Sequence, residues 1–127
     1  MMAIELGPIL ADRKAFMKVH EEQRGSAKVV FLNGSMTGGD DRDWVEPVTK
    51  LLDEGKGGVI LEMSQVSYIS SAGLGDLVRI TALANSQGVK FMLAAVSPFV
   101  EAVLKTTHLD KFFDVSRDLD SALAKID

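Results

Sequence analysis

The sequence contains no cysteine, which excludes disulfide bridges, thiolate metal sites and a cysteine nucleophile. It also has no excess of positive charge: 14 Lys and Arg against 18 Asp and Glu give a formal net charge of −4. Nucleic acids and anionic membranes attract basic surfaces, so we expect neither as a partner. No uncharged run approaches the roughly 20 apolar residues that span a bilayer. The apolar start carries Glu5 and no basic residue, unlike a signal peptide. These absences predict a soluble cytoplasmic protein without membrane insertion.

What is present fits one globular domain. The chain has 127 residues, of which 46% are hydrophobic and 25% charged. A chain of this size can form a single hydrophobic core without disulfide or metal cross-links. No internal repeat or low-complexity tract occurs. Gly7 and Pro8 indicate that residues 1–12 form a tail or a loosely attached edge, so we expect the domain to span residues 13–127.

Short β-branched runs alternate with segments of helical spacing along the chain. Five segments are typical of strands, namely 16–22, 28–32, 59–63, 90–96 and a short one within 112–115. Four segments are typical of helices: Trp44 to Leu52, ended by Gly55; Ser70 to Gln87, capped by Gly88; one that starts at Ser97-Pro98 with Phe99, Val103 and Leu104 facing inward; and Leu119 to Ile126. This order predicts an α/β fold, with about four helices on a four- to five-stranded, mostly parallel sheet whose first pair forms an antiparallel edge.

The stretch from Ser64 to Ile80 is the most informative part of the sequence. It predicts a loop that delivers two hydroxyls, those of Ser70 and Ser71, to the first turn of a helix. Backbone N–H groups at a helix start lack intrahelical partners and the helix dipole is positive there, so a phosphate on either serine would be held. Phosphorylation adds about −1.5 to −2 charges at neutral pH, which can turn a partner's attraction into repulsion. Gly73 and Gly75 keep this turn thin, which lets another protein approach the backbone.

The same segment resembles the signature of the STAS domain family, an Asp-Ser-Ser-Gly-Leu-Gly-like sequence between a strand and a helix. Here the signature reads Ser70-Ser71-Ala72-Gly73-Leu74-Gly75. Residues 29–36, 59–69 and 88–115 resemble other parts of the family, so the likeness runs from about Phe16 to the end of the chain. Four departures stand out: Ser70 replaces the signature Asp, Ala72 replaces the next serine, Thr37 stands where an acidic residue is common, and Glu62-Met63 replaces Asp-Leu.

The resemblance implies an anti-sigma factor antagonist, which is a binding module and not an enzyme. Such a module binds an anti-sigma factor with serine kinase activity while unphosphorylated, is released when phosphorylated, and is reset by a serine phosphatase. The phosphorylated position in the family corresponds to Ser71, with Ser70 as the alternative. ATP would be the partner's cofactor, and we expect none for this chain, which would be a monomer or a weak dimer.

We expect the partner to bind around the helix start. Ile80 and Leu83 join this surface because they lie off the apolar stripe of their helix. The full set comprises Thr37, Ser70, Ala72, Gly73, Leu74, Gly75, Asp76, Ile80 and Leu83.

Other interpretations remain. The serine pair can be a plain N-cap in a non-switching STAS subunit of a signalling or lipid-transport assembly, or the helix start can bind a small nucleotide or anion. A hydrolase triad of Ser71 with a histidine lacks the Gly-x-Ser-x-Gly elbow. Neither of the two histidines, His20 and His108, has a metal-ligating partner at useful spacing. Dipole stabilisation of a helix start explains Asp40, Asp41 and Asp43 better than a cation site does.

Overall fold

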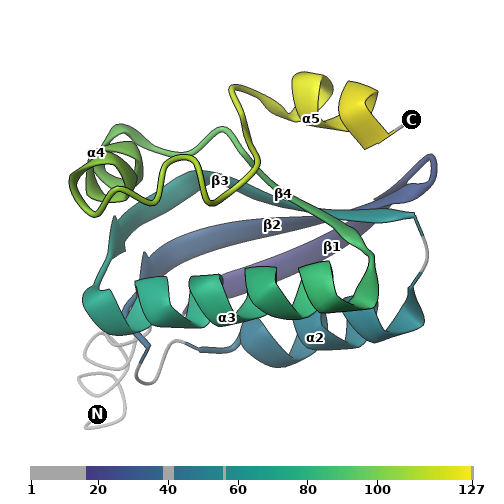
Figure 1. Cartoon of the computed structure of the whole chain (residues 1–127), viewed down its shortest axis with the longest axis horizontal. Helices are drawn as coiled ribbons and strands as arrows, with labels where there is room; N and C mark the ends of the chain where they lie inside the picture. The colour runs from purple at the N-terminus through teal and green to yellow at the C-terminus, as the bar shows by residue number, and fades with distance from the viewer. Residues whose placement is uncertain (1–16, 39–41, 56, 127) are drawn as a thin grey trace, which may run out of the picture.

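The computed structural model describes residues 17–38, 42–55 and 57–126, and these form a layered α/β domain (Figure 1). The elements follow in the order β1 (Lys18–Arg24), β2 (Ala27–Met36), α2 (Val45–Glu54), β3 (Gly58–Ile69), α3 (Ser71–Gln87), β4 (Lys90–Ala94), α4 (Pro98–Thr106), β5 (Val115–Ser116) and α5 (Leu119–Ile126). The predicted alternation of strands and helices is therefore confirmed within the described residues.

The five strands lie in the order β1-β2-β3-β4-β5. β1 pairs with β2 antiparallel, and every other neighbouring pair is parallel, as predicted. Gly25, at a φ of 62°, forms the tight turn of the β1–β2 hairpin together with Ser26. α2 and α3 cover one face of the sheet, whereas α4 and α5 lie on the other (Figure 1). The helix that follows β3 and the helix that follows β4 therefore pack on opposite faces of the sheet.

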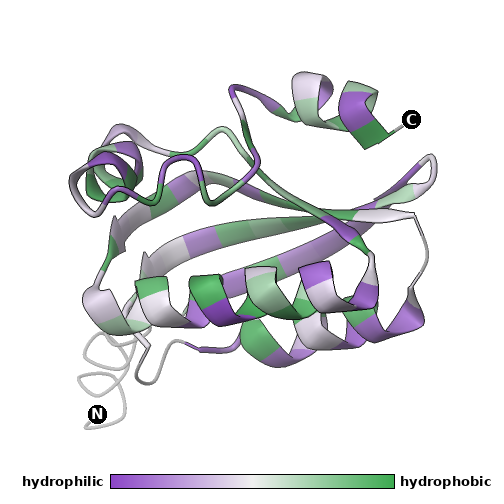
Figure 2. Ribbon diagram, in the orientation of Figure 1, coloured by the Kyte–Doolittle hydropathy of each residue, from purple (hydrophilic) through white to green (hydrophobic). Residues whose placement is uncertain are grey.

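Apolar side chains fill both layers. The larger cluster joins the sheet to helices α2 and α3, includes the fully buried Trp44, and extends to Val100 and Leu104 of α4. The smaller one joins Val29, Ile60 and Met92 of the sheet to Ala122 of α5. Figure 2 shows the contrast between the hydrophobic central strands and the mostly hydrophilic β1, which forms one edge of the sheet. Burying these apolar faces drives the two helix layers onto the sheet.

The bounds of all five strands differ from the sequence-based prediction. β1 is shifted to Lys18–Arg24, and β2 continues to Met36 through register shifts on either side of Asn33 and Gly34. β4 ends at Ala94, and the last strand is Val115–Ser116 instead of 112–115. The largest error concerns Ser64 to Ile69, which was expected to be a loop but forms the second half of β3. This half pairs with β2, from Gln65 opposite Asn33 to Ile69 opposite Met36.

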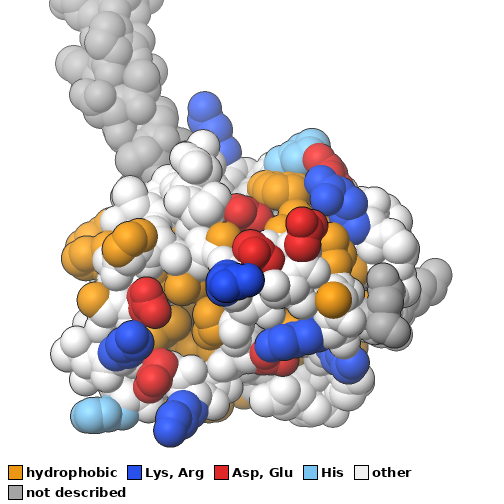
Figure 3. Space-filling model, turned by 90° about the horizontal axis from the view of Figure 1, so that it is seen from above, with side chains coloured by type: hydrophobic (Ala, Val, Ile, Leu, Met, Phe, Trp, Pro, Cys, Tyr) orange, Lys and Arg blue, Asp and Glu red, His pale blue; other side chains and the backbone are white. Residues whose placement is uncertain are grey.

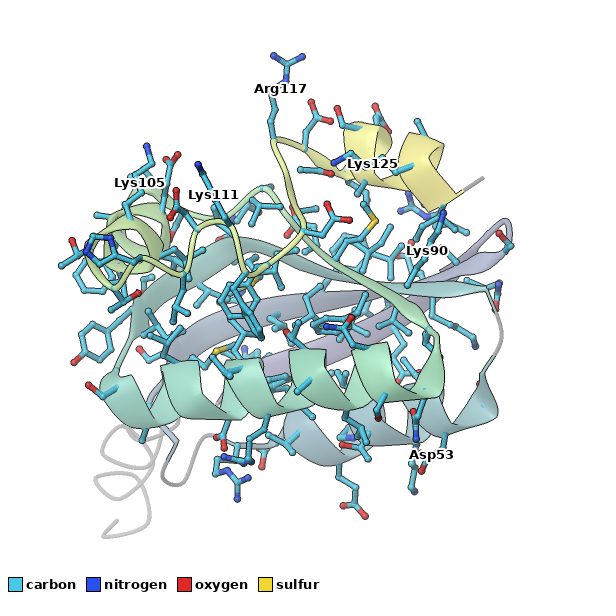
Figure 4. The ribbon with its side chains drawn as sticks, viewed as in Figure 1. Asp53, Lys90, Lys105, Lys111, Arg117 and Lys125 are labelled. Atoms are coloured by element: carbon cyan, nitrogen blue, oxygen red, sulfur yellow. The ribbon has the colours of Figure 1, made fainter. Side chains whose placement is uncertain are left out.

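The helix ends agree with the predicted signals. Gly55 and Gly88 adopt left-handed conformations, at φ of 63° and 71°, after α2 and α3. The Ser97 hydroxyl caps α4 by accepting the Val100 N–H. Side chains also join neighbouring elements, since Gln87 donates to Asp53 of α2 at 2.9 Å, and Lys90 donates to the Lys125 carbonyl at 3.0 Å. Figure 4 shows Lys90 and Lys125 together beside α5, and Asp53 on α2.

The structure does not test two of the sequence-based expectations, because it does not describe the residues concerned. The tail at residues 1–12, and Asp40 and Asp41, lie outside the described residues. Over the part of the chain that is described, no helix has the length and apolar character needed to cross a bilayer.

Candidate functional site

α3 begins directly at the carboxyl end of β3, with Ser70 as the single linking residue. The Ser70 backbone is extended, and its N–H donates to the carbonyl of Met36, the last residue of β2, at 3.0 Å. Its hydroxyl donates to the Thr37 carbonyl at 2.8 Å and accepts the Gly73 N–H at 3.2 Å. Ser70 is therefore an N-cap that also ties the helix start to the end of β2. An Asp at this position can accept the Gly73 N–H but cannot donate to Thr37.

Ser71 is the first residue of α3, and its environment is different. Its side chain is exposed, and no hydrogen bond from it to another described residue is found. Within the same described residues, the N–H groups of Ser71 and Ala72 also have no acceptor, as is usual for the first turn of a helix. As far as the described residues show, the site thus presents a free hydroxyl beside free N–H donors at the positive end of a helix dipole.

Gly73 and Gly75, the two glycines near the start of α3, differ in the space around them. A Cβ on Gly73 would lie 2.0 Å from the Met36 carbonyl oxygen, so β2 leaves no room for a side chain there. Gly38, at a φ of 82°, likewise rests on Ala72, where a Cβ would come within 2.6 Å of the Ala72 Cβ. A Cβ on Gly75, by contrast, would have no atom of another described residue within 4 Å, apart from its chain neighbours and the backbone of its own helix. Internal packing therefore explains Gly73 but not Gly75.

Asp76 is a buried carboxylate that links α3 to the segment before α2. Its side chain is 5% exposed, and it accepts hydrogen bonds from Arg42, through Nε at 2.8 Å, and from Arg79, one turn further along α3. Burial is the largest single influence and raises the pKa of Asp76, but the hydrogen bonds and charges of Arg42 and Arg79 together outweigh it. The net result is a pKa below the usual carboxyl range, so Asp76 is ionised at neutral pH and fastens the segment before α2 onto α3.

The residues that were expected to form the partner surface differ in how far they are buried. Ser71 and Ala72 are exposed, and Thr37, Ser70, Gly75 and Leu83 are half-buried, whereas Gly73, Leu74, Asp76 and Ile80 are buried. The expectation that Ile80 lies off the apolar stripe is wrong: the residue is 5% exposed and belongs to the main core. Leu83, expected beside it, packs against the same core. The reason is that α3 contacts α2 as well as β3 and β4, so it buries a wider arc than one stripe.

Sequence reasoning missed an aromatic pair at the same end of the molecule. Tyr68 of β3 and Phe99 of α4 are 44% and 45% exposed, and their ring centroids are 5.3 Å apart. Phe99 was predicted to face inward, which is wrong. The signal was weak because the two residues are far apart in the sequence and only the fold brings them together. Arg42 was also missed, since nothing local marks it as the partner of Asp76.

The described residues contain no group of three or more His, Asp or Glu side chains that could hold a metal ion. Asp43 is exposed just before α2. His20 lies on β1, where it contacts Glu22 at 3.1 Å, and His108 follows α4 at a φ of 61°. Both histidines are exposed.

Comparisons with known proteins agree on one family. The model of the STAS domain matches residues 18–122. A protein of Thermotoga neapolitana named as an anti-sigma factor antagonist is 31% identical over 85 residues, which cover 67% of this chain and 74% of that protein. The crystal structure of an anti-sigma factor antagonist from Mycobacterium paratuberculosis is similar with a TM-score of 0.79 at 20% identity, over 88% of this chain and 95% of that one. The Bacillus cell fate determinant SpoIIAA, in its phosphorylated form, has a TM-score of 0.67 at 14% identity, over 87% of this chain and all of that one (100%).

Proposed function

The chain belongs to the STAS domain family, among relatives that are anti-sigma factor antagonists, and we propose that it is a phosphorylatable switch of this kind. The unmodified protein binds an anti-sigma factor that has serine kinase activity. Phosphorylation of Ser71 releases it, and a serine phosphatase restores the binding state. The chain itself supplies a surface and an acceptor hydroxyl, acts in the cytoplasm, and is not an enzyme.

The observation that carries the proposal is the exposed Ser71 hydroxyl at the start of α3. A kinase must reach the acceptor oxygen, and a free hydroxyl costs no intramolecular hydrogen bond when it is modified. The N–H groups of Ser71 and Ala72, which have no acceptor among the described residues, and the helix dipole favour the phosphate once it is attached. The domain therefore stays folded while its surface gains about −1.5 to −2 charges.

The hydrogen bonds of Ser70 argue against it as the acceptor. A phosphate on its oxygen would remove the donor to the Thr37 carbonyl, at 2.8 Å, and disturb the cap on Gly73. Ser70 is also half-buried, between the end of β2 and the first turn of α3. Modification there would loosen the helix start, whereas modification of Ser71 leaves it intact. SpoIIAA, which shares the fold, is a precedent for a phosphorylated protein of this architecture.

The test uses the purified anti-sigma factors with serine kinase activity that are encoded in the genome carrying this chain, each tested separately. We expect one of them to bind the unmodified chain, and to phosphorylate it with ATP at Ser71, as mapped by mass spectrometry. Ser71→Ala should bind and resist phosphorylation, while Ser71→Asp should bind more weakly. Ser70→Ala is the matched control, which should still be phosphorylated. Equal affinity of Ser71→Ala and Ser71→Asp for the partner would count against the switch.

The second candidate is a non-switching STAS subunit of a signalling or lipid-transport assembly. One observation favours it: the N-cap role fully accounts for Ser70, where the family signature has Asp. This alternative predicts that no serine kinase modifies the chain and that Ser71→Asp leaves its assembly unchanged.

A further inference from the structure

Tyr68 and Phe99 are two of the three large hydrophobic side chains that are exposed among the described residues. Each exposes nearly half of its surface, yet the two rings lie against each other with centroids 5.3 Å apart. The third, Phe112, is 42% exposed and packs edge-on against Phe113. Exposed aromatic side chains add little to folding, but aromatic residues are enriched at the centres of protein interfaces.

The fold attaches both members of the pair to the sheet. Tyr68 lies on β3 opposite Ser35 of β2. Phe99 lies in the first turn of α4, and the N-cap Ser97 fastens that turn to the sheet, because its hydroxyl donates to the Val66 carbonyl of β3 at 2.7 Å. The backbone positions of both residues are therefore set before any partner arrives, and the two rings already contact each other, which lowers the entropy cost of binding.

The pair lies beside the proposed phosphorylation site. Tyr68 comes three residues before Ser71, so their Cα atoms are within about 11 Å of each other. The carboxyl end of β3, the start of α3 and α4 gather at the same end of the molecule (Figure 1). Figure 3 shows hydrophobic side chains at that end, at the left of the view. The labelled Lys105, Lys111 and Arg117 point outward from α4 and from the segment that follows it (Figure 4).

The size of the patch argues against a second copy of this chain as its occupant. Two aromatic side chains that are just under half exposed offer roughly 150–200 Å². Obligate homodimers bury about 2,000 Å² or more in total across a mostly apolar surface. Beyond the pair, the described residues offer only one further exposed large hydrophobic side chain, Phe112. The pair has instead the dimensions of an anchor within a larger heteromeric interface, and the neighbouring exposed surface that extends it is the first turn of α3.

We propose that Tyr68 and Phe99 are the anchor by which the anti-sigma factor holds this chain, through an apolar pocket that closes over both rings. This inference rests on the proposed function, because it names the surface through which the anti-sigma factor binds. A partner seated on the pair covers Ser71 at the rim of the contact. A phosphate on Ser71 must then lose its water against that partner, and this desolvation and charge drive the release.

The experiment measures the Kd of the purified anti-sigma factor for four forms of the full chain: wild type, Tyr68→Ala, Phe99→Ala and Phe112→Ala. Phe112→Ala is the matched control, because its side chain is equally exposed but lines a cavity together with Thr81 and Gly88, in the second half of α3 and at its end. We expect Tyr68→Ala and Phe99→Ala each to weaken binding by about 30-fold or more, as truncated anchor residues do, and Phe112→Ala to change it less than threefold. Circular dichroism and thermal unfolding of each variant check its fold, and Tyr68→Phe should bind like the wild type.

The outcomes separate this inference from the function on which it rests. If the wild type binds and is released by phosphorylation, but both alanine variants at the pair bind unchanged, the anchor is elsewhere and the switch stands. If the loss for Phe112→Ala equals that for Phe99→Ala, the effect is not specific to the pair and the inference is overturned. If Tyr68→Ala instead abolishes a dimer seen by ultracentrifugation, the occupant is a second copy. If no anti-sigma factor binds the wild type, the proposed function and this inference both fall.

Discussion

Gly73 and Gly75 allow a sharp test of how the start of α3 is built. We expect Gly75→Ala to stabilise the isolated protein by about 0.5–1 kcal/mol, because alanine is the better helix former and no described residue beyond its own helical turn lies within 4 Å of the new methyl group. For a chain of 127 residues this should raise Tm by about 2–5 °C. Gly73→Ala should have the opposite effect. Its methyl group would overlap the Met36 carbonyl at 2.0 Å, and relieving such an overlap costs about 1–3 kcal/mol.

Urea unfolding followed by tryptophan fluorescence measures both effects, since Trp44 is the only tryptophan and is fully buried. The same two variants then serve in a binding assay with the anti-sigma factor. Gly75 follows Ser71 by one helical turn, so a partner that covers Ser71 also meets the new methyl group. Gly75→Ala should therefore bind about tenfold more weakly although it is the more stable protein, a difference of about 1.4 kcal/mol.

Two results would refute this reasoning. A Gly75→Ala variant that unfolds as easily as Gly73→Ala would mean that the position has a packing role within the chain. A Gly75→Ala variant that is more stable and binds with unchanged affinity would mean that no partner approaches this face of α3.

Ser70→Ala should lower the free energy of unfolding by about 1–2 kcal/mol, because it removes an N-cap and a hydrogen bond to the end of β2. Ser71→Ala should change it by less than about 0.5 kcal/mol. Urea unfolding of the two variants side by side checks this, and equal losses would contradict the assigned roles. Asp76→Asn should destabilise the protein by about 1–3 kcal/mol at pH 7, because Arg42 and Arg79 lose their buried counter-charge. The loss is moderate since the two arginine side chains are 43% and 62% exposed and stay solvated. Because folding lowers the pKa of Asp76, its contribution is present above the pKa of an unfolded carboxyl and is lost as the pH falls through the lowered value. The gap between wild type and Asp76→Asn should therefore narrow on acidification from pH 6 toward pH 2, and a gap that stays constant over that range would exclude the charge as its origin.

The order of the elements could be read from the sequence because local signals and tertiary structure agree there. Gly55 and Gly88 end helices in the left-handed conformation, and Ser97 with Pro98 starts one, for reasons that lie within a few residues. Ser64 to Ile69 has no such clear signal, because its exposed serines and Gln65 interrupt the alternation of a half-buried strand. The strand exists because β2 continues beside it.

The candidate site was found from the serine pair, but the roles of its members needed the fold. The sequence does not distinguish the roles of Ser70 and Ser71. In the structure, the Ser70 hydroxyl is bonded to the Thr37 carbonyl and the Gly73 N–H, and the Ser71 hydroxyl has neither contact. Ile80 and Phe99 were assigned to opposite environments from those they have. Helical periodicity shows that a helix has an apolar arc, but not how many neighbours it contacts or whether a ring leaves the core to stack on Tyr68.

The central claim is that a phosphate on Ser71 leaves the domain folded and removes its partner. The most direct measurement is isothermal titration calorimetry of the purified anti-sigma factor against the unmodified chain and against the chain with phosphoserine incorporated at position 71. We predict that the phosphorylated chain retains its Tm within a few degrees and binds about 100-fold more weakly or worse, as a charge forced into an unfavourable contact requires. Equal affinity of the two forms, or unfolding of the phosphorylated one, would contradict the account.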